Sequence, residues 1–445
     1  GCNASKVSPG DEPPTISKKR QQAILNAKGR WIAKHLLFPA LAAAAKPEPG
    51  WQLPKLTAEQ QAEWEEKKQR IAEQIAKPNT RWDKLGASVL KLALADTKLV
   101  DAAWLAALAD AGGVLPRCQD LPAEAVVTYE EMAKYGVHVL VISYPWLDAD
   151  HPDKNGLQLR KLAFVLKAAA KDAAEWGFKF GVFWDYCALP QRSREASAKG
   201  EDDRTAEEKA TFGRGLKGIN EFYGHQLTHV LLVDTELPPG PKTNSQQYLK
   251  RGWCLMEYYA SGIVKNSFSL ISLSKLSGEE TRWLDVRRNG KAGRAPPMAP
   301  AAFAVKLESG VATGEVGFTN KGDVPLVTGI YDKAFMTEMT KATRLAYNGL
   351  KWDDAQGVQL CEALRHAQAH GGLRELKELA LYDNELGDGF VTAFVALLDE
   401  GGLANVEELY LGRNAISDAG MRELAAAVAR GGLPKCTDLD LGGNP

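Results

Sequence analysis

The sequence has few cysteines, no long hydrophobic run and almost no net charge. Its six cysteines are far apart and form no CxxC pair, which argues against a disulfide framework or a zinc site and leads us to expect a reducing, cytosolic compartment. No apolar run approaches the roughly 18 residues of a membrane-spanning helix. Lysine plus arginine (55) nearly equal aspartate plus glutamate (56), so the composition does not indicate nucleic-acid binding.

The chain is 445 residues long, of which 45% are apolar and 25% are charged. These proportions are typical of globular proteins. At about 150 residues per domain, the length predicts two to four domains. Composition therefore predicts a folded, multidomain protein, and its chemistry must be sought in the motifs.

The N-terminal residues, Gly-Cys-Asn-Ala-Ser-Lys, fit a lipid-modification pattern if an initiator methionine is removed. Gly1 is then a candidate for N-myristoylation, with Ser5 at the expected spacing, and Cys2 is a candidate for S-palmitoylation. One myristoyl chain binds a membrane only weakly, and a second acyl chain or a basic patch makes the attachment stable. The basic residues that follow are Lys6, Lys18, Lys19, Arg20, Lys28, Arg30 and Lys34. We expect a peripheral anchor on the inner membrane leaflet; the alternative is a flexible tail whose glycine comes from expression.

Short apolar runs alternate with helical patterns in the centre of the chain. The runs lie at 137–143, 179–184 and 229–233, and the helical patterns lie at 157–175 and 206–223. Strands that alternate with helices predict a parallel sheet, and near-continuous apolar strands predict burial on both faces. The stretch 285–300, rich in basic residues, glycine and proline, predicts a loop.

The C-terminal part repeats with a period of 30 residues. Asn384, Asn414 and Asn444 share this spacing, and so do three Gly-Gly-Leu triplets. Each unit reads L-x-L-x-x-N, a strand followed by a helix with the asparagine bonded to backbone in the turn. This pattern resembles leucine-rich repeats of the ribonuclease-inhibitor type. The last unit stops in mid-repeat at Pro445, so we expect that the array continues or that another element covers its end.

Alternation along the repeat strands predicts an exposed acidic row. Glu378, Glu408 and Asp438 occupy equivalent outward positions, and Tyr382 and Tyr410 flank them. Such a row suits a basic partner, although a row of charges is also found on a plain solvated face. We expect the repeats to bind a protein partner through these residues.

Residues suited to chemistry follow each of the three predicted strands. Ser143 and Trp146 follow the first strand and Asp185 follows the second. Trp253 and Glu257 lie one helical turn apart after the third. Residues just beyond the carboxyl ends of parallel strands line the ligand crevice of such sheets, so we expect these side chains at one rim. Aromatic walls with a few polar groups are typical of a small-molecule site, and no residue spacing predicts a metal site.

The order of these segments resembles that of two families. The blocks SYPW, FWDYCALPQ, INEFYGH, HVLLV and RGWCLMEY are similar to the successive blocks of the heterokaryon-incompatibility (HET) domain. VISY and WCLMEY also resemble the first strand and the W-C-x-x-E helix of the more distant TIR domain. The likeness spans residues 137–259 and implies a parallel, flavodoxin-like α/β fold.

The TIR resemblance implies an activity as well as a fold. TIR enzymes cleave the nicotinamide–ribose bond of NAD(P), and their catalytic glutamate corresponds to Glu257. A carboxylate there can stabilise an oxocarbenium-like centre. We expect Ser143, Trp146, Asp185 and Trp253 to bind the nucleotide, which would be a substrate and not a cofactor. TIR catalysis generally requires self-assembly, which the resemblance therefore also implies.

Two features limit this interpretation. The charged stretch 192–209 replaces the short loop that TIR domains usually have after the second strand. HET domains are defined mostly by the cell death they cause, so likeness to them does not establish an enzyme. The alternative is that Trp253 is a core residue and that Glu257 forms an ion pair with Arg251 or Arg192.

The sequence thus predicts a four-part chain: a lipidated anchor at 1–16, a helical extension at 17–135, a TIR/HET-like α/β domain at 136–335 and leucine-rich repeats at 340–445. One function is a membrane-tethered intracellular sensor that hydrolyses NAD(P) and binds partners through its repeats. The other is a non-catalytic scaffold in which both domains bind proteins. Whether Glu257 lies in an open cleft or is enclosed by its neighbours distinguishes the two.

Overall fold

The computed structural model describes residue 69 and residues 87–133, 137–238, 240 and 244–445. The chain divides into two units, 1–56 and 57–445, and the described residues belong to the second. The predicted anchor with Gly1 and Cys2, and most of the predicted helical extension, lie outside the described residues.

In the described part of the chain, the central fold is a six-stranded, mainly parallel sheet with the order β2-β1-β4-β3-β5-β6. Its strands are β1 (Leu99–Asp101), β2 (Val126–Val127), β3 (Val139–Ser143), β4 (Gly181–Phe183), β5 (His229–Leu232) and β6 (Leu270–Ser272). β4, β3, β5 and β6 are parallel, whereas β1 runs antiparallel to both of its neighbours. The chain is therefore a mixed α/β protein, as predicted.

The sheet begins earlier in the chain than the predicted boundary at residue 136. β3, β4 and β5 lie within the three predicted runs, but β1 and β2 come from the stretch that we predicted to be helical. These two strands are three and two residues long, too short to show a period of two in the sequence. These strands are recognised only in the structure, where β1 pairs with β4 and with β2.

Helices cover both faces of the sheet. They are α4 (Ala87–Ala93), α5 (Ala102–Asp110), α6 (Tyr129–Met132), α7 (Leu157–Trp176), α8 (Asp185–Ala188), α9 (Arg194–Lys199), α10 (Ala206–Lys217), α11 (Asn220–Gly224), α12 (Gly252–Ser261), α13 (Trp283–Asn289), α14 (Pro300–Thr313) and α15 (Val324–Lys341). Leu140 and Ile142 of β3 pack in the cluster that contains α5, α7 and α13 residues. Val139 and Val141, which point the other way, pack with α11, α12 and α15. Burial on both faces explains why the strand is apolar throughout.

The predicted loop at 285–300 is partly helical. α13 takes in its first five residues because Trp283 and Val286 are buried one turn apart against the sheet. Further along, the side chain of Arg294 is 3% exposed, so this basic residue lies in the interior. The prediction of an irregular loop over the whole stretch was therefore wrong.

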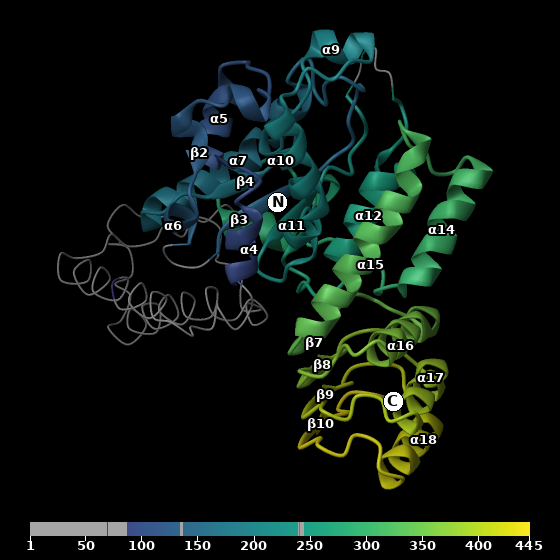
Figure 1. The fold of residues 1–445 in the computed structure, drawn as a ribbon. Coiled ribbons are helices and arrows are strands. Elements are labelled where there is room, and N and C mark those ends of the chain that lie inside the picture. The colour runs from purple at the N-terminus through teal and green to yellow at the C-terminus, as the bar shows by residue number, and fades with distance from the viewer. Residues whose placement is uncertain (1–68, 70–86, 134–136, 239, 241–243) are drawn as a thin grey trace, which may run out of the picture. The chain divides into compact units, whose positions relative to one another are not determined.

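The 30-residue units form a second, parallel sheet with the order β10-β9-β8-β7. Each unit contributes one strand and, except for the last, one helix: β7 (Arg344–Ala346), α16 (Asp354–Ala369), β8 (Glu378–Ala380), α17 (Asp388–Asp399), β9 (Glu408–Tyr410), α18 (Asp418–Ala429) and β10 (Asp438–Asp440). The strands stack on one side of this part and the helices on the other (Figure 1). In the part of the chain that the structure describes, one face of this sheet is therefore free of helices.

The repeated asparagines link successive units. The Asn384 amide donates to the carbonyls of Tyr347 (2.8 Å) and Leu381 (2.9 Å), and its side-chain oxygen accepts from the N–H groups of Leu350 and Trp352. Asn414 and Asn444 repeat this arrangement one and two units later. The role that the spacing predicted, a bond from asparagine to backbone in the turn, is confirmed.

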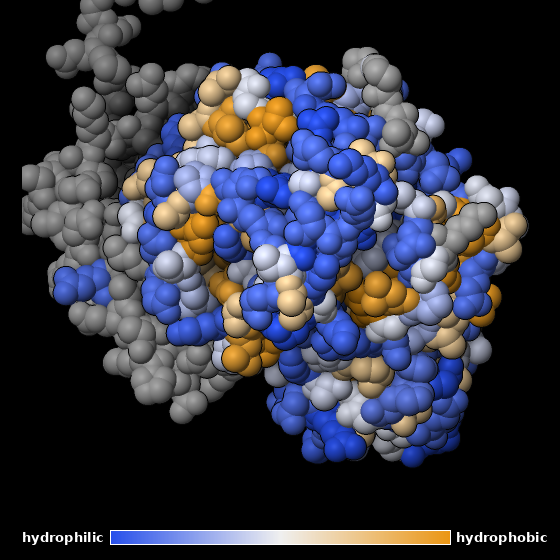
Figure 2. Space-filling model, turned by 45° about the horizontal axis from the view of Figure 1, so that its top comes forward, coloured by the Kyte–Doolittle hydropathy of each residue, from blue (hydrophilic) through white to orange (hydrophobic). Residues whose placement is uncertain are grey.

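No helix within the described ranges is long and apolar enough to cross a membrane. The face shown in Figure 2 is largely hydrophilic, and its hydrophobic residues form separate patches. Most large apolar side chains of the described residues instead lie in two interior clusters. One packs on one face of the six-stranded sheet, and the other runs from its opposite face into the repeat units.

Candidate functional site

Ser143 lies where the order of the parallel strands reverses. It ends β3, the first of the four parallel strands in the chain, with β4 on one side and β5 on the other. α7, which follows β3, packs on one face, and α12, which follows β5, packs on the other. In open α/β sheets, ligands bind at such a switch point, beyond the carboxyl ends of the strands. The structure thus brings the predicted rim residues to the position where a site is expected.

Ser143 joins the two segments that meet at this point. Its hydroxyl donates to Glu257 Oε2 at 2.5 Å, and because it has one proton it accepts from the Tyr248 hydroxyl. Tyr248 belongs to the 3-10 turn η4 (Tyr248–Lys250), directly before α12, and Glu257 lies within α12. Glu257 is 7% exposed. In this arrangement its carboxyl group is enclosed by its neighbours.

Enclosure changes the acid strength of Glu257. Burial raises its pKa to about 8, and the nearby Asp185 carboxylate adds to the rise, while hydrogen bonds from Ser143 and Tyr223 oppose it. At neutral pH the carboxyl group is therefore mostly protonated. In that form it can donate a proton, but it cannot stabilise a cationic centre until it ionises.

Asp185 and Trp146 also meet at the rim, but they bind each other. The Trp146 indole donates to Asp185 Oδ2 at 3.0 Å. The other oxygen accepts from the Tyr144 hydroxyl and from the backbone N–H of Tyr186, both at 2.6 Å. Burial raises the pKa of Asp185, and these three hydrogen bonds oppose that rise. Both carboxylate oxygens thus already have partners within the chain.

Trp253 makes its polar contact away from this cluster. Its indole donates to Asp323 Oδ2 at 3.0 Å, at the start of α15. Arg251, which the sequence offered as an ion-pair partner for Glu257, donates instead to the carbonyls of Trp146, Asn244 (3.0 Å) and Gln246 (2.7 Å). It therefore ties the segment after β3 to the segment after β5.

Asp153 is a structural residue at this edge whose role the sequence analysis missed. Its two oxygens accept from the N–H groups of Leu157 (2.8 Å) and Leu159 (2.9 Å) at the start of α7. The helix that follows the first strand is where nucleotide-binding sheets hold a phosphate. Here the chain's own carboxylate occupies that place. An aspartate four residues before the first helical residue was the available signal.

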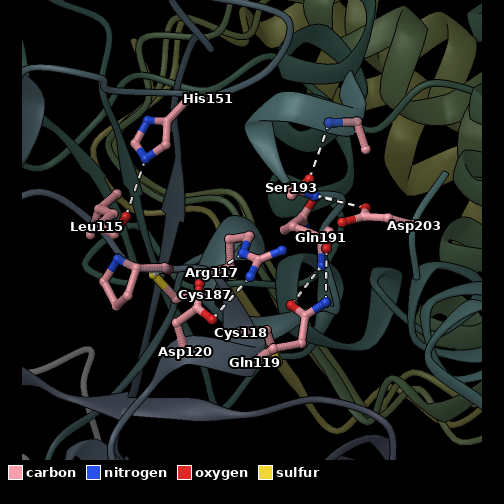
Figure 3. A network of polar contacts seen from close by, with 12 residues as sticks. Leu115, Arg117, Cys118, Gln119, Asp120, His151, Cys187, Gln191, Ser193 and Asp203 are labelled. Carbon is pink, nitrogen blue, oxygen red and sulfur yellow. Dashed lines mark hydrogen bonds and ion pairs between the residues drawn. The ribbon is translucent and has the colours of Figure 1, made fainter. Parts of the chain in front are cut away.

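Figure 3 shows a polar network that fixes the segment after β4. The Gln119 amide donates to the Gln191 carbonyl at 2.8 Å, and the Gln191 N–H donates back to Gln119 Oε1 at 3.0 Å. The Cys187 thiol donates to the carbonyl of Pro116 at 3.2 Å. Cys187 is fully buried, and burial raises the pKa of its thiol well above the ordinary value, which favours a packing role for this residue. The network ties residues 187–191, just after Asp185, to residues 116–119.

The predicted acidic row lies in register on the helix-free face of the repeats. Glu378, Glu408 and Asp438 are direct neighbours on β8, β9 and β10. The Tyr410 hydroxyl lies within hydrogen-bond distance of Glu408 (2.9 Å) and of Asp438 (3.1 Å), and the two carboxylates share its one proton. These contacts, together with partial burial, raise the pKa of Tyr410. Tyr382 is 37% exposed. At the other end of the row, Arg344 of β7 pairs with Glu378 at 2.7 Å.

Comparisons with family models, curated proteins and solved structures give no match for this chain. Within the described ranges, no group of three or more His, Cys, Asp or Glu side chains is placed to hold a metal ion. Any proposed function must therefore rest on two groups of polar residues. One is the enclosed Ser143–Glu257 cluster at the sheet edge, and the other is the acidic row of Glu378, Glu408 and Asp438 on the repeats.

Proposed function

We propose that this chain is a membrane-tethered intracellular signalling or assembly protein whose C-terminal part binds a basic protein partner. The proposal takes the 30-residue units as a leucine-rich-repeat solenoid and the central sheet as a TIR/HET-like module. The single observation that supports it best is the helix-free sheet face with Glu378, Glu408 and Asp438 in register. The enclosure of Glu257 also favours a binding role over a catalytic one.

The charges on this face suit a lysine-rich or arginine-rich segment. One member of the row, Glu378, is paired with Arg344, whereas Glu408 and Asp438 have only the neutral Tyr410 hydroxyl between them. The negative potential is therefore strongest over β9 and β10. A partner that brings cationic side chains there would gain complementary charge and an aromatic surface.

Neutralising these two carboxylates should weaken binding of a basic peptide. With a labelled lysine-rich peptide as the probe, we expect Glu408→Gln combined with Asp438→Asn to weaken binding about fivefold to thirtyfold, because each exposed ion pair contributes roughly 0.5 to 1 kcal/mol. Both replacements keep an acceptor for Tyr410. Fluorescence anisotropy at low and high salt measures the effect, which salt should reduce.

Glu362→Gln serves as the matched control. Glu362 is exposed on α16, on the helical side of the units, so its loss should leave peptide binding unchanged. The control removes one charge and the double variant removes two, so a loss of binding free energy in the control of half that in the double variant or more would show that only overall charge matters. That result would refute binding at this face.

A second candidate function is hydrolysis of NAD(P) at Glu257. One observation favours it: Ser143 and Glu257 meet at the switch point of the sheet, where ligands of such folds bind. Water would add to the ribose carbon as the bond to nicotinamide breaks, with release of a proton. Glu257 would have to leave its contact with Ser143 and ionise in order to stabilise the cationic ribose.

This activity should require an ionised Glu257. We expect nicotinamide release to rise with pH through about 8, the pKa of Glu257, and to vanish in folded Glu257→Gln. Chromatography of NAD incubated with concentrated protein and a crowding agent measures the release, with a TIR enzyme as positive control. No release by the native chain, under conditions in which the TIR enzyme works, would exclude this candidate.

A further inference from the structure

α12 is held at its N-terminal end by the segment between α14 and α15, residues 315–323, which we call the strap. The Gly252 N–H donates to the Gly317 carbonyl at 3.0 Å, and the Gly317 N–H donates back to the Lys250 carbonyl at 2.9 Å. Phe318 packs directly on Gly252, because a Cβ atom placed there would lie 1.8 Å from its ring. The Trp253–Asp323 hydrogen bond completes this contact.

The C-terminal end of α12 is held by the first repeat unit. The buried Arg294 guanidinium donates to the carbonyls of Gly262 and Lys265, just beyond α12, and also to that of Ala346 in β7. The Tyr347 hydroxyl donates to the Ile263 carbonyl at 2.5 Å. Arg294 and Tyr347 therefore join the segment after α12 to the first repeat unit.

The strap and Tyr347 belong to one continuous stretch of chain, whereas Arg294 comes from the segment before α14. The strap leads into α15, which packs on α12 and ends just before β7. Residues 315–347 therefore hold α12 at both ends, while Glu257 in the same helix contacts Ser143 of the sheet. A shift of this stretch relative to the sheet would act on the Ser143–Glu257 contact through α12.

We propose that α12 couples the repeat units to the Ser143–Glu257 cluster, so that a partner bound on the repeats changes how tightly the cluster is enclosed. The proposal deepens the partner-binding function and rests on it for its biological role. The coupling itself is a property of the chain alone. It can therefore be tested without partner or nucleotide, and its failure is distinguishable from failure of peptide binding or of NAD turnover.

Weakening one end of α12 should loosen the other end. Tyr347→Phe removes the hydroxyl bond to Ile263, and Asp323→Ala removes the acceptor of Trp253. Tyr347→Phe loses one hydrogen bond, and Asp323→Ala loses two, from Trp253 and from the Asn320 amide. We therefore expect backbone amides at 252–257 in Tyr347→Phe to exchange about threefold to tenfold faster, and those at 344–350 in Asp323→Ala to exchange at least as much faster. Hydrogen–deuterium exchange with mass spectrometry on the full chain measures both.

Asp323→Asn is the matched control: the asparagine oxygen can still accept from Trp253, and only the exposed contact with Asn320 is lost. Exchange at 344–350 in this variant should equal that of the native chain. Exchange in α7, on the other face of the sheet, should stay unchanged in all variants. Faster exchange confined to the neighbourhood of each substitution, or spread equally over α7, would overturn the proposal.

Discussion

Replacing Asn384 with alanine is expected to lower the free energy of unfolding by about 3 kcal/mol or more. The side chain is 8% exposed and makes four hydrogen bonds to backbone groups of two successive units. Alanine would leave those buried groups without partners, and each such group costs roughly 1 to 3 kcal/mol. Denaturant unfolding followed by circular dichroism measures the loss.

Asn444→Ala provides the matched comparison. Asn444 makes the same kinds of bonds, to Leu411, Leu441 and Ile416, but it is only partly buried. Water can replace its bonds more easily, so we expect a loss of about 1 kcal/mol. Equal losses for the two variants would mean that burial does not set the contribution of these asparagines.

Replacing Glu257 with glutamine is expected to stabilise the protein at alkaline pH. The folded-state pKa of Glu257 is raised to about 8, whereas in the unfolded chain it is near 4.3. As pH rises between these values, the unfolded chain loses the proton and the folded chain keeps it, so the stability of the native protein falls. At about 1.4 kcal/mol per pKa unit, the loss from this group approaches roughly 4 to 5 kcal/mol above pH 8.

Glutamine does not titrate and has nearly the shape of the protonated acid. The free energy of unfolding of the variant should therefore equal that of the native protein at pH 4. It should exceed the native value by a growing amount up to pH 8, and by a constant amount above pH 8. Denaturant unfolding from pH 4 to pH 9 measures both curves, and Glu362→Gln, at an exposed position, should follow the native curve. Parallel curves for the native protein and Glu257→Gln would show that Glu257 is not titrating in a buried state.

Much of the central fold could be predicted from local patterns. Near-continuous apolar runs give β3, β4 and β5, and α7 follows from its helical periodicity. β1 and β2 could not be predicted because they are two to three residues long and form only by pairing with strands far away in the chain. The buried place of Arg294 could not be predicted either, since a basic residue among glycines and prolines usually lies in solvent.

The candidate site, too, could be predicted only in part from the sequence. Because the carboxyl ends of parallel strands meet at one edge, the sequence sufficed to bring Ser143, Asp185 and Glu257 together there. It did not indicate that Trp146 and Tyr144 use both oxygens of Asp185, or that Asp153 caps α7. Those contacts depend on side-chain directions after the helices have packed.

The sequence by itself determined which residues share an edge or a repeat position, because strand direction and a 30-residue period are properties of the chain. Only the tertiary structure decided what those residues do there. Packing encloses Glu257 against Ser143 and raises the pKa of Glu257. It places Glu408 and Asp438 on a sheet face that no helix of the described residues covers. Whether a side chain is buried or exposed depends on residues that are distant in the sequence. Local sequence patterns therefore do not predict it.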